Sequence, residues 1–181
     1  MDRSNARLFS RICAQLEQLD LSIHDARIYN ANDGMTMDTF FVLGSNGQSI
    51  AEDTARINQV RAQLSRALQQ DEASEQVNRR TPRVKKSFSI PTETNMSVDE
   101  IKNYSVLEVA TPDRPGLLAK IGRIFVDFGV ELQAAKIQTL GERVEDVFFI
   151  TEANQQPITD PERCEALQQA IRNELDEQAA A

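Results

Sequence analysis

The chain has 181 residues, 40% of them hydrophobic, and a formal net charge of −8. This length suits one large domain or two small ones, and the acidic charge disfavours nucleic acid as a partner. No apolar run approaches the roughly 18 residues that a membrane span needs, and a polar segment follows Met1 where a secretory signal would be apolar. We therefore expect a cytoplasmic protein with no membrane contact.

The first half of the chain predicts two helices around two strands. Hydrophobic residues at helical spacing favour a helix from Leu8 to Leu19. Strands are expected over residues 21–29 and 35–43, separated by a turn rich in Asn, Asp and Gly. A second helix is expected from Asp53 on. Cysteines 13 and 164 both fall on predicted helices, so we expect reduced thiols rather than a disulfide or a metal pair.

The second half is organised around a strand, a tight turn and a helix over residues 104–128. Residues 105–111 are rich in Val and partly alternating, as in a half-buried strand. The sequence Pro-Asp-Arg-Pro-Gly at residues 112–116 ends that strand, because Pro lacks a hydrogen-bond donor and Gly allows unusual dihedrals. Backbone N–H groups at such a helix start bind anions. We therefore predict a small-molecule site at this turn.

An internal repeat relates the two halves at an offset of 109 residues, which falls to 108 after one residue drops out of a turn. The matching segments are residues 8–12 with 117–121, 21–28 with 130–137, and 38–42 with 146–150. The hydrophobic face of the helix after Asp53 then matches a helix near the C-terminus. Four elements in the same order rarely agree by chance, so we interpret the chain as two copies of one unit.

Each copy corresponds to part of a strand–helix–strand–strand–helix–strand unit, the ferredoxin-like α+β arrangement with an antiparallel sheet. The first copy, residues 1–90, lacks the strand before its helix, so we expect a piece cut just inside a larger protein. A partner chain or a strand over residues 84–90 would take the place of the missing strand. Otherwise the neighbouring strand would remain at the edge of the sheet. The second copy, residues 91–181, lacks its last strand, which residues 92–98 can replace by forming a hairpin with residues 104–110. Units this small should pair their sheets or dimerise, with the sheet face that carries no helices free to meet a second sheet.

Three segments of the second copy resemble an ACT domain. They are Pro-Asp-Arg-Pro-Gly-Leu-Leu at residues 112–118, Gly-Val-Glu-Leu at residues 129–132, and Gly-Glu-Arg-Val-Glu-Asp-Val-Phe-Phe-Ile at residues 141–150. With residues 21–28 and the two-copy layout, the whole chain resembles the tandem C-terminal ACT region of bacterial bifunctional uridylyltransferase/uridylyl-removing enzymes. Members of that family modify the nitrogen-regulatory PII protein.

The resemblance implies regulation by glutamine. In that family glutamine signals nitrogen sufficiency through these domains, favouring removal of uridylyl groups from PII and opposing their addition. The nucleotidyltransferase and HD-type hydrolase domains, with their Mg²⁺, would lie N-terminal to this chain. Since the chain has one histidine, His24, and no paired His-Asp metal motif, we expect it to hold no catalytic residue, metal or cofactor. A homodimer that binds glutamine or another small amino acid is expected.

Candidate ligand residues come from the turn and from the strand after the first helix of each copy. At the turn, Gly116 would let the ligand approach the backbone, and the N–H groups of Leu117 and Leu118 would receive its carboxylate. Asp113 would contact the ligand or cap the helix. Polar strand residues would meet the ammonium group or the side chain. The full set is Asp113, Arg114, Pro115, Gly116, Leu117, Leu118, Gln133, His24 and Asp25.

Neither copy holds a complete site. Ala134 stands beside Gln133 where a second polar residue is usual, whereas the first copy keeps His24 and Asp25 but lacks the Pro-Gly turn. A site shared between copies or between chains is one solution. Two alternatives remain: a structural dimerisation module that binds no ligand, and a sensor of another amino acid.

The last predicted strand is preceded by a charged segment. We interpret these residues as charged turn residues beside a buried strand, with a signalling surface as the alternative. They are Glu142, Arg143, Glu145 and Asp146. Phe148 and Phe149, which follow, are expected in the core or at an interface.

Overall fold

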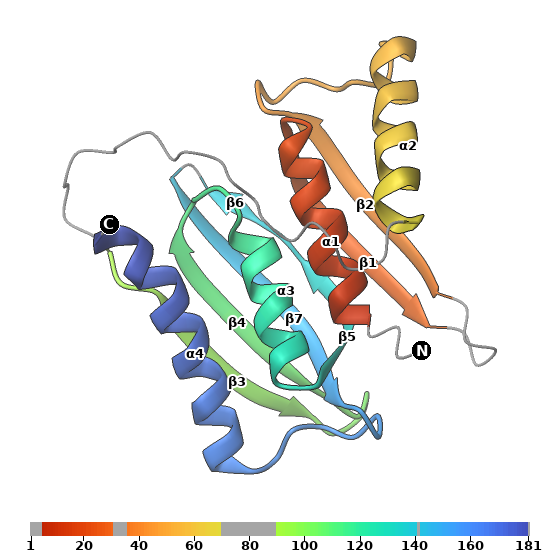
Figure 1. The fold of residues 1–181 in the computed structure, drawn as a ribbon. Helices are drawn as coiled ribbons and strands as arrows, with labels where there is room; N and C mark the ends of the chain where they lie inside the picture. Colours follow the sequence, from red (N-terminus) through yellow and green to blue (C-terminus); the bar gives the residue numbers. More distant parts are fainter. Residues whose placement is uncertain (1–4, 31–35, 70–89, 141, 181) are drawn as a thin grey trace.

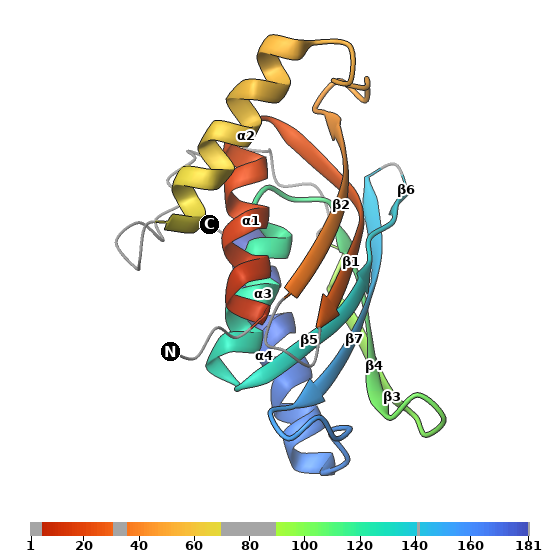
Figure 2. The ribbon, with the colours of Figure 1, turned by 90° about the vertical axis from the view of Figure 1, so that its right-hand side faces the viewer.

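The computed structural model describes residues 5–30, 36–69, 90–140 and 142–180, and these form an α+β fold with one antiparallel sheet. The elements are α1 (Asn5–Gln18), β1 (Leu21–Asn30), β2 (Thr36–Gly44), α2 (Thr54–Gln69), β3 (Glu93–Asp99), β4 (Tyr104–Pro112), α3 (Leu117–Asp127), β5 (Val130–Lys136), β6 (Thr139–Leu140), β7 (Arg143–Glu152) and α4 (Pro161–Ala180). The strand order is β2-β1-β5-β7-β4-β3, with β6 paired to β7. All four helices lie on one face of the sheet (Figures 1 and 2). Within the described ranges, no helix combines the length and apolar character that crossing a membrane requires.

The second unit contains β4, α3, β5, β7 and α4 in the ferredoxin-like order. Its sheet is completed on the outer side by β3, which pairs antiparallel with β4 from Glu93 opposite Ala110 to Asp99 opposite Tyr104. The connecting turn is stabilised by the Asp99 carboxylate, which accepts the N–H groups of Ile101 and Lys102 at 3.1 and 3.0 Å. The unit therefore obtains a strand beside its first strand from the segment that precedes it in the chain.

The first unit contains α1, β1, β2 and α2, and β2 is the outermost strand on that side of the described sheet. Helix α2 begins after Asp53, whose carboxylate accepts the N–H of Arg56 at 2.9 Å and so caps the helix. Residues 84–89, where a strand could have filled the place beside β2, lie outside the described residues. The expected strand over residues 84–90 therefore remains a prediction.

The two units join edge to edge. Ala26 of β1 pairs with Ala135 of β5, and α1 packs against α3, where Ser10 Oγ donates to the Ala119 carbonyl at 2.8 Å. In each of these pairs the two residues are 109 positions apart in the sequence, which is the offset of the repeat. Equivalent elements of the two units therefore contact each other at equivalent positions. The two sheets of the repeat therefore pair within this chain, and they do so edge to edge, not through the face that carries no helices. Small buried alanines let the two strand edges approach, and the sheet continues from one unit into the other.

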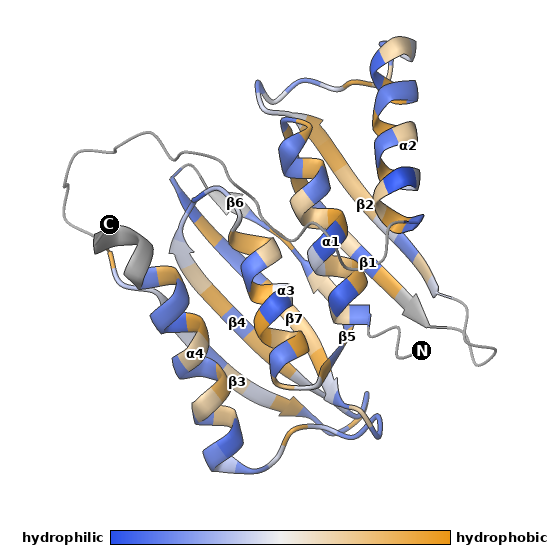
Figure 3. Cartoon of the chain, viewed as in Figure 1, coloured by the Kyte–Doolittle hydropathy of each residue, from blue (hydrophilic) through white to orange (hydrophobic). Residues whose placement is uncertain are grey.

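One hydrophobic core extends across this junction. The ring of Phe9 on α1 lies 6.1 Å from Phe40 of its own unit and 6.4 Å from Phe148 of the other, which in turn contacts Phe125 at 5.4 Å. Figure 3 shows hydrophobic residues along the strands and mainly hydrophilic ones on α2 and α4. Phe149 lies partly buried against Tyr104, 5.0 Å away. Cysteines 13 and 164 are both free thiols, as predicted.

Candidate functional site

The turn between β4 and α3 has the backbone geometry that its sequence predicts. Gly116 precedes the first helical residue with φ 79° and ψ 2°, in the left-handed region where a side chain is unfavourable. The Asp113 N–H donates to the Glu142 carbonyl at 2.8 Å, which ties the turn to the start of β7. No side chain caps α3, so the interpretation of Asp113 as the helix cap is wrong. The cap position is a glycine, which leaves the helix start open to a ligand.

The N–H groups at the start of α3 are arranged slightly differently from the prediction. The Leu117 N–H points to the Arg114 carbonyl at 3.4 Å, and the first helical bond runs from the Lys120 N–H to the Gly116 carbonyl at 3.0 Å. An α-helix leaves its first N–H groups without a carbonyl partner inside the helix. In α3 the groups placed to bind an anion are therefore those of Leu118 and Ala119, one residue further on than expected.

A pocket of about 300 Å³ lies at this turn, between the two units. The second unit contributes the turn, the start of α3 and residues from the end of β5 and from β7, whereas the first contributes α1 and the start of β1. The lining residues are Cys13, Glu17, Asp20–His24, Ser45, Asp113–Ala119, Ile137, Val144 and Asp146. The pocket exists only because the two units are joined.

Seven of the nine candidate ligand residues line this pocket. They are the six turn residues from Asp113 to Leu118 and, from the other unit, His24. The remaining two lie elsewhere: Asp25 forms an ion pair with Arg27 at 3.2 Å, and Gln133 donates to the Thr151 hydroxyl at 3.0 Å. His24 and Gln133 occupy equivalent bulges in β1 and β5, but only the bulge of β1 faces the pocket.

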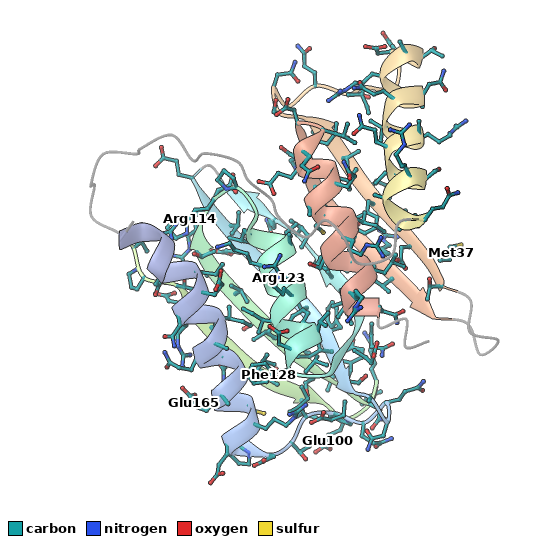
Figure 4. The ribbon with its side chains drawn as sticks, viewed as in Figure 1. Met37, Glu100, Arg114, Arg123, Phe128 and Glu165 are labelled. Atoms are coloured by element: carbon teal, nitrogen blue, oxygen red, sulfur yellow. The ribbon has the colours of Figure 1, made fainter. Side chains whose placement is uncertain are left out.

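The turn arginine is held away from the rest of the pocket. The Arg114 guanidinium donates to the Leu175 carbonyl near the end of α4, and Figure 4 shows Arg114 at the start of α3, toward α4. Four carboxyl groups line the same pocket, those of Glu17, Asp20, Asp113 and Asp146. The lining is therefore acidic overall, which favours a ligand that carries a positive group.

Asp146 is the site residue that sequence reasoning misplaced. It was expected among charged turn residues, but it lies within β7 and is 1% exposed. Burial raises its pKa to about 7, an effect that the Gln138 N–H opposes and the Asp113 carboxylate reinforces. The alternation of Val144, Asp146, Phe148 and Ile150 on one strand face was the available signal, because residues two apart share a face.

Two further lining residues were missed because they lie on α1 of the other unit. Glu17 Oε2 would lie 3.8 Å from a Cβ placed on Gly116, so this carboxylate faces the start of α3. Cys13 is buried beside it, and burial raises the pKa of its thiol well above the ordinary value, with the Glu17 and Asp146 charges adding to the effect. Cys13 was predicted only as a core residue of this helix, and Glu17 was not singled out, since the sequence does not show which turn packs against α1.

Comparison with known proteins finds a family model that matches part of the second unit. Residues 105–167 match the ACT domain. The chain is 47% identical over 173 residues to the bifunctional uridylyltransferase/uridylyl-removing enzyme of Ectopseudomonas mendocina strain ymp, which covers 95% of the chain. It is 47% identical over 168 residues to the enzymes of the same description from Pseudomonas putida strain W619 and Pseudomonas entomophila strain L48, covering 92% of the chain. The chain spans 19% of the length of each of these relatives. No solved structure matches it.

Proposed function

We propose that this chain, of which residues 105–167 match the ACT domain, is the glutamine-sensing regulatory region of a bifunctional uridylyltransferase/uridylyl-removing enzyme. The observation that carries the proposal is the pocket between the units. It combines an open helix start, which suits a carboxylate, with an acidic lining, which suits an ammonium group. A free α-amino acid carries both charges on neighbouring atoms.

The charges in the pocket favour glutamine over glutamate. Four lining carboxyl groups stand against one guanidinium, and that guanidinium is bonded to α4. Glutamate would bring a second carboxylate into this environment, whereas glutamine brings a neutral amide. Like charges placed together in a partly desolvated site are costly, so discrimination follows from repulsion as well as from attraction.

A ligand in this pocket would contact both units at once. The units meet through one strand pair and through α1 against α3. Binding would therefore favour one relative placement of the units over others, and a catalytic region attached to them would respond to that difference. In this proposal the uridylyl-transferring and uridylyl-removing chemistry, and the PII partner, belong to the longer protein, which functions as a cytoplasmic homodimer.

Calorimetry of the 181-residue chain tests the proposal. Glutamine should release or absorb measurable heat and saturate, while glutamate, serine and branched-chain amino acids should bind at least tenfold more weakly. If another amino acid saturates the chain and glutamine does not, the chain senses that amino acid instead of glutamine. A folded chain that binds none of them would instead favour a structural pairing module.

Two matched glycine substitutions test the site. Gly116→Leu should abolish binding because the side chain would enter the pocket near Glu17, whereas Gly129→Leu should leave binding intact. Both glycines have positive φ, at 79° and 62°, so both variants should lose a similar stability of roughly 1–2 kcal/mol. A Cβ on Gly129 meets nothing within 4 Å. Equal affinities of the two variants for glutamine, measured by calorimetry, would contradict the site.

A further inference from the structure

Asp146 is a buried acid at the pocket wall, and one of its carboxyl oxygens has no hydrogen-bond partner. Its Oδ1 accepts the Gln138 N–H at 3.2 Å, while its Oδ2 is fully buried without a hydrogen-bond partner. Val144, Phe148 and Ile150, on the same strand face, are also buried. A buried carboxyl oxygen without a partner is costly when the group is ionised. The cost is avoided when the acid is protonated or when another group supplies the missing interaction, and of the two such acids, Asp38 and Asp146, only Asp146 lines the pocket.

The pocket itself does not supply a cation to Asp146. The other titratable residues that line the pocket are Cys13 and Glu17 of α1, Asp20 and His24 of the first unit, and Asp113 and Arg114 of the turn. The thiol is neutral because burial raises its pKa well above the ordinary value, and the Asp113 carboxylate repels a negative charge on Asp146. Arg114, the one lysine or arginine among the lining residues, donates to the Leu175 carbonyl instead. The pocket wall therefore lacks a positive group that pairs with Asp146, and a ligand from outside the chain would supply one.

We propose that Asp146 is the specificity-determining residue of the pocket and that its ionised carboxylate binds the ammonium group of the amino-acid ligand. The inference rests on the proposed function and adds the residue that selects for an ammonium group. The helix start at Leu118 and Ala119 holds the ligand carboxylate, and the Asp146 carboxylate on β7, at the pocket wall, holds the ammonium group. A charge pair formed in a desolvated site is strong and directional.

Binding is then coupled to a proton. Burial holds the pKa of Asp146 at about 7, so near that pH about half of the unliganded protein carries a neutral acid there. An ammonium group stabilises the ionised form, so the ligand displaces the proton into solvent. At pH 7 each bound ligand should release up to about half a proton, and lowering the pH to 5.5 should weaken binding by about tenfold.

The first unit contains a matched acid that serves as the control. Asp38 of β2 is equivalent to Asp146 in the repeat, and both its oxygens are buried without a partner. Burial raises its pKa to about 6, but it does not line the pocket. Replacing either aspartate by asparagine keeps the shape and removes the charge, so the two variants differ chiefly in whether the changed group faces the ligand.

The experiment is glutamine calorimetry on the chain and its variants in buffers of different ionisation enthalpy. The unchanged chain and D38N should bind glutamine with the same proton release at pH 7. D146N should bind at least tenfold more weakly, with no proton release and no weakening between pH 7 and 5.5. The deaminated analogue 4-carbamoylbutanoate should bind the unchanged chain and D146N within about twofold of each other. Circular dichroism confirms that each variant is folded.

The outcomes separate this inference from the proposed function. If glutamine binds the unchanged chain and D146N with equal affinity and equal proton release, Asp146 is not the ammonium site, while the sensing function stands. If D146N keeps the pH dependence, another group carries it, and the inference is again overturned. If the unchanged chain binds no amino acid at any pH, both proposals fail together.

Discussion

At the residue scale, the pocket is defined by two side chains whose environments are the reverse of what their types suggest. Asp146, a charged residue, lies in the core, while Gly116, which has no side chain, occupies the cap position of α3, where a polar side chain is usual. The first was hidden in a charged stretch of sequence, and the second was identifiable because a left-handed turn residue before a helix is nearly always glycine. The burial of a strand residue depends on which elements pack against the strand, whereas the backbone conformation of a turn depends mainly on the residues of the turn itself.

Removing the charge of Asp146 should stabilise the fold at neutral and alkaline pH. The pKa of the folded state, about 7, lies above the ordinary aspartate value, so the protonated form favours folding and this contribution is lost as the pH rises through 7. We expect D146N to match the unchanged chain near pH 4 and to exceed its free energy of unfolding by about 2–4 kcal/mol at pH 8. Urea denaturation at both pH values measures this. A variant less stable at pH 8 would contradict the burial of the carboxylate.

At the element scale, the contact between α1 and α3 brings the two units together. A Cβ placed on Gly122 would lie 2.9 Å from the Ser10 Cβ and 3.1 Å from the Phe9 ring, so the helices approach too closely for any larger residue. The bond from Ser10 to the Ala119 carbonyl sits at the same crossing. The sequence marked Gly122 only as an interruption of an apolar helix, because nothing local shows that a second helix crosses there.

Enlarging Gly122 should therefore destabilise the chain through this crossing. Gly122→Val should lower the free energy of unfolding by about 1–3 kcal/mol, because the added methyl groups overlap with Ser10 and Phe9. Arg123→Val, on the exposed side of α3 (Figure 4), provides the control for placing Val in this helix, and its effect should be smaller than that of Gly122→Val. Urea denaturation followed by circular dichroism compares the two. Equal effects would mean that the helices do not cross this closely.

At the scale of the whole molecule, the two units share one sheet and one core. Phe9 contacts Phe40 on one side and Phe148 on the other, so a side chain of the first unit is part of the core of both. The sheet continues through the Ala26 and Ala135 pair. With this much shared burial, the described parts of the chain should unfold as one cooperative body.

Truncating Phe9 tests this cooperativity. Phe9→Ala should cost about 3–5 kcal/mol and shift a single unfolding transition, because the ring is fully buried between the units. Phe41→Ala, on β2 with its side chain 50% exposed, should cost less than about 1 kcal/mol. Circular dichroism and hydrogen exchange of β7 amides should give the same midpoint. Two transitions, with that of β7 unchanged in Phe9→Ala, would show that the units fold separately.

The sequence alone determined what depends on neighbouring residues in the chain. The strand, turn and helix around residues 104–127, the glycine of the turn and the ferredoxin-like order of elements all follow from periodicity and turn chemistry, which act over a few residues. Six of the nine predicted ligand residues are consecutive turn residues at the pocket for the same reason. Tertiary structure alone decided that the units join edge to edge and that Glu17 faces Gly116. It also decided that Asp146 is buried at the pocket wall. Those features arise where segments about 100 residues apart pack together, and packing partners are set by the whole fold.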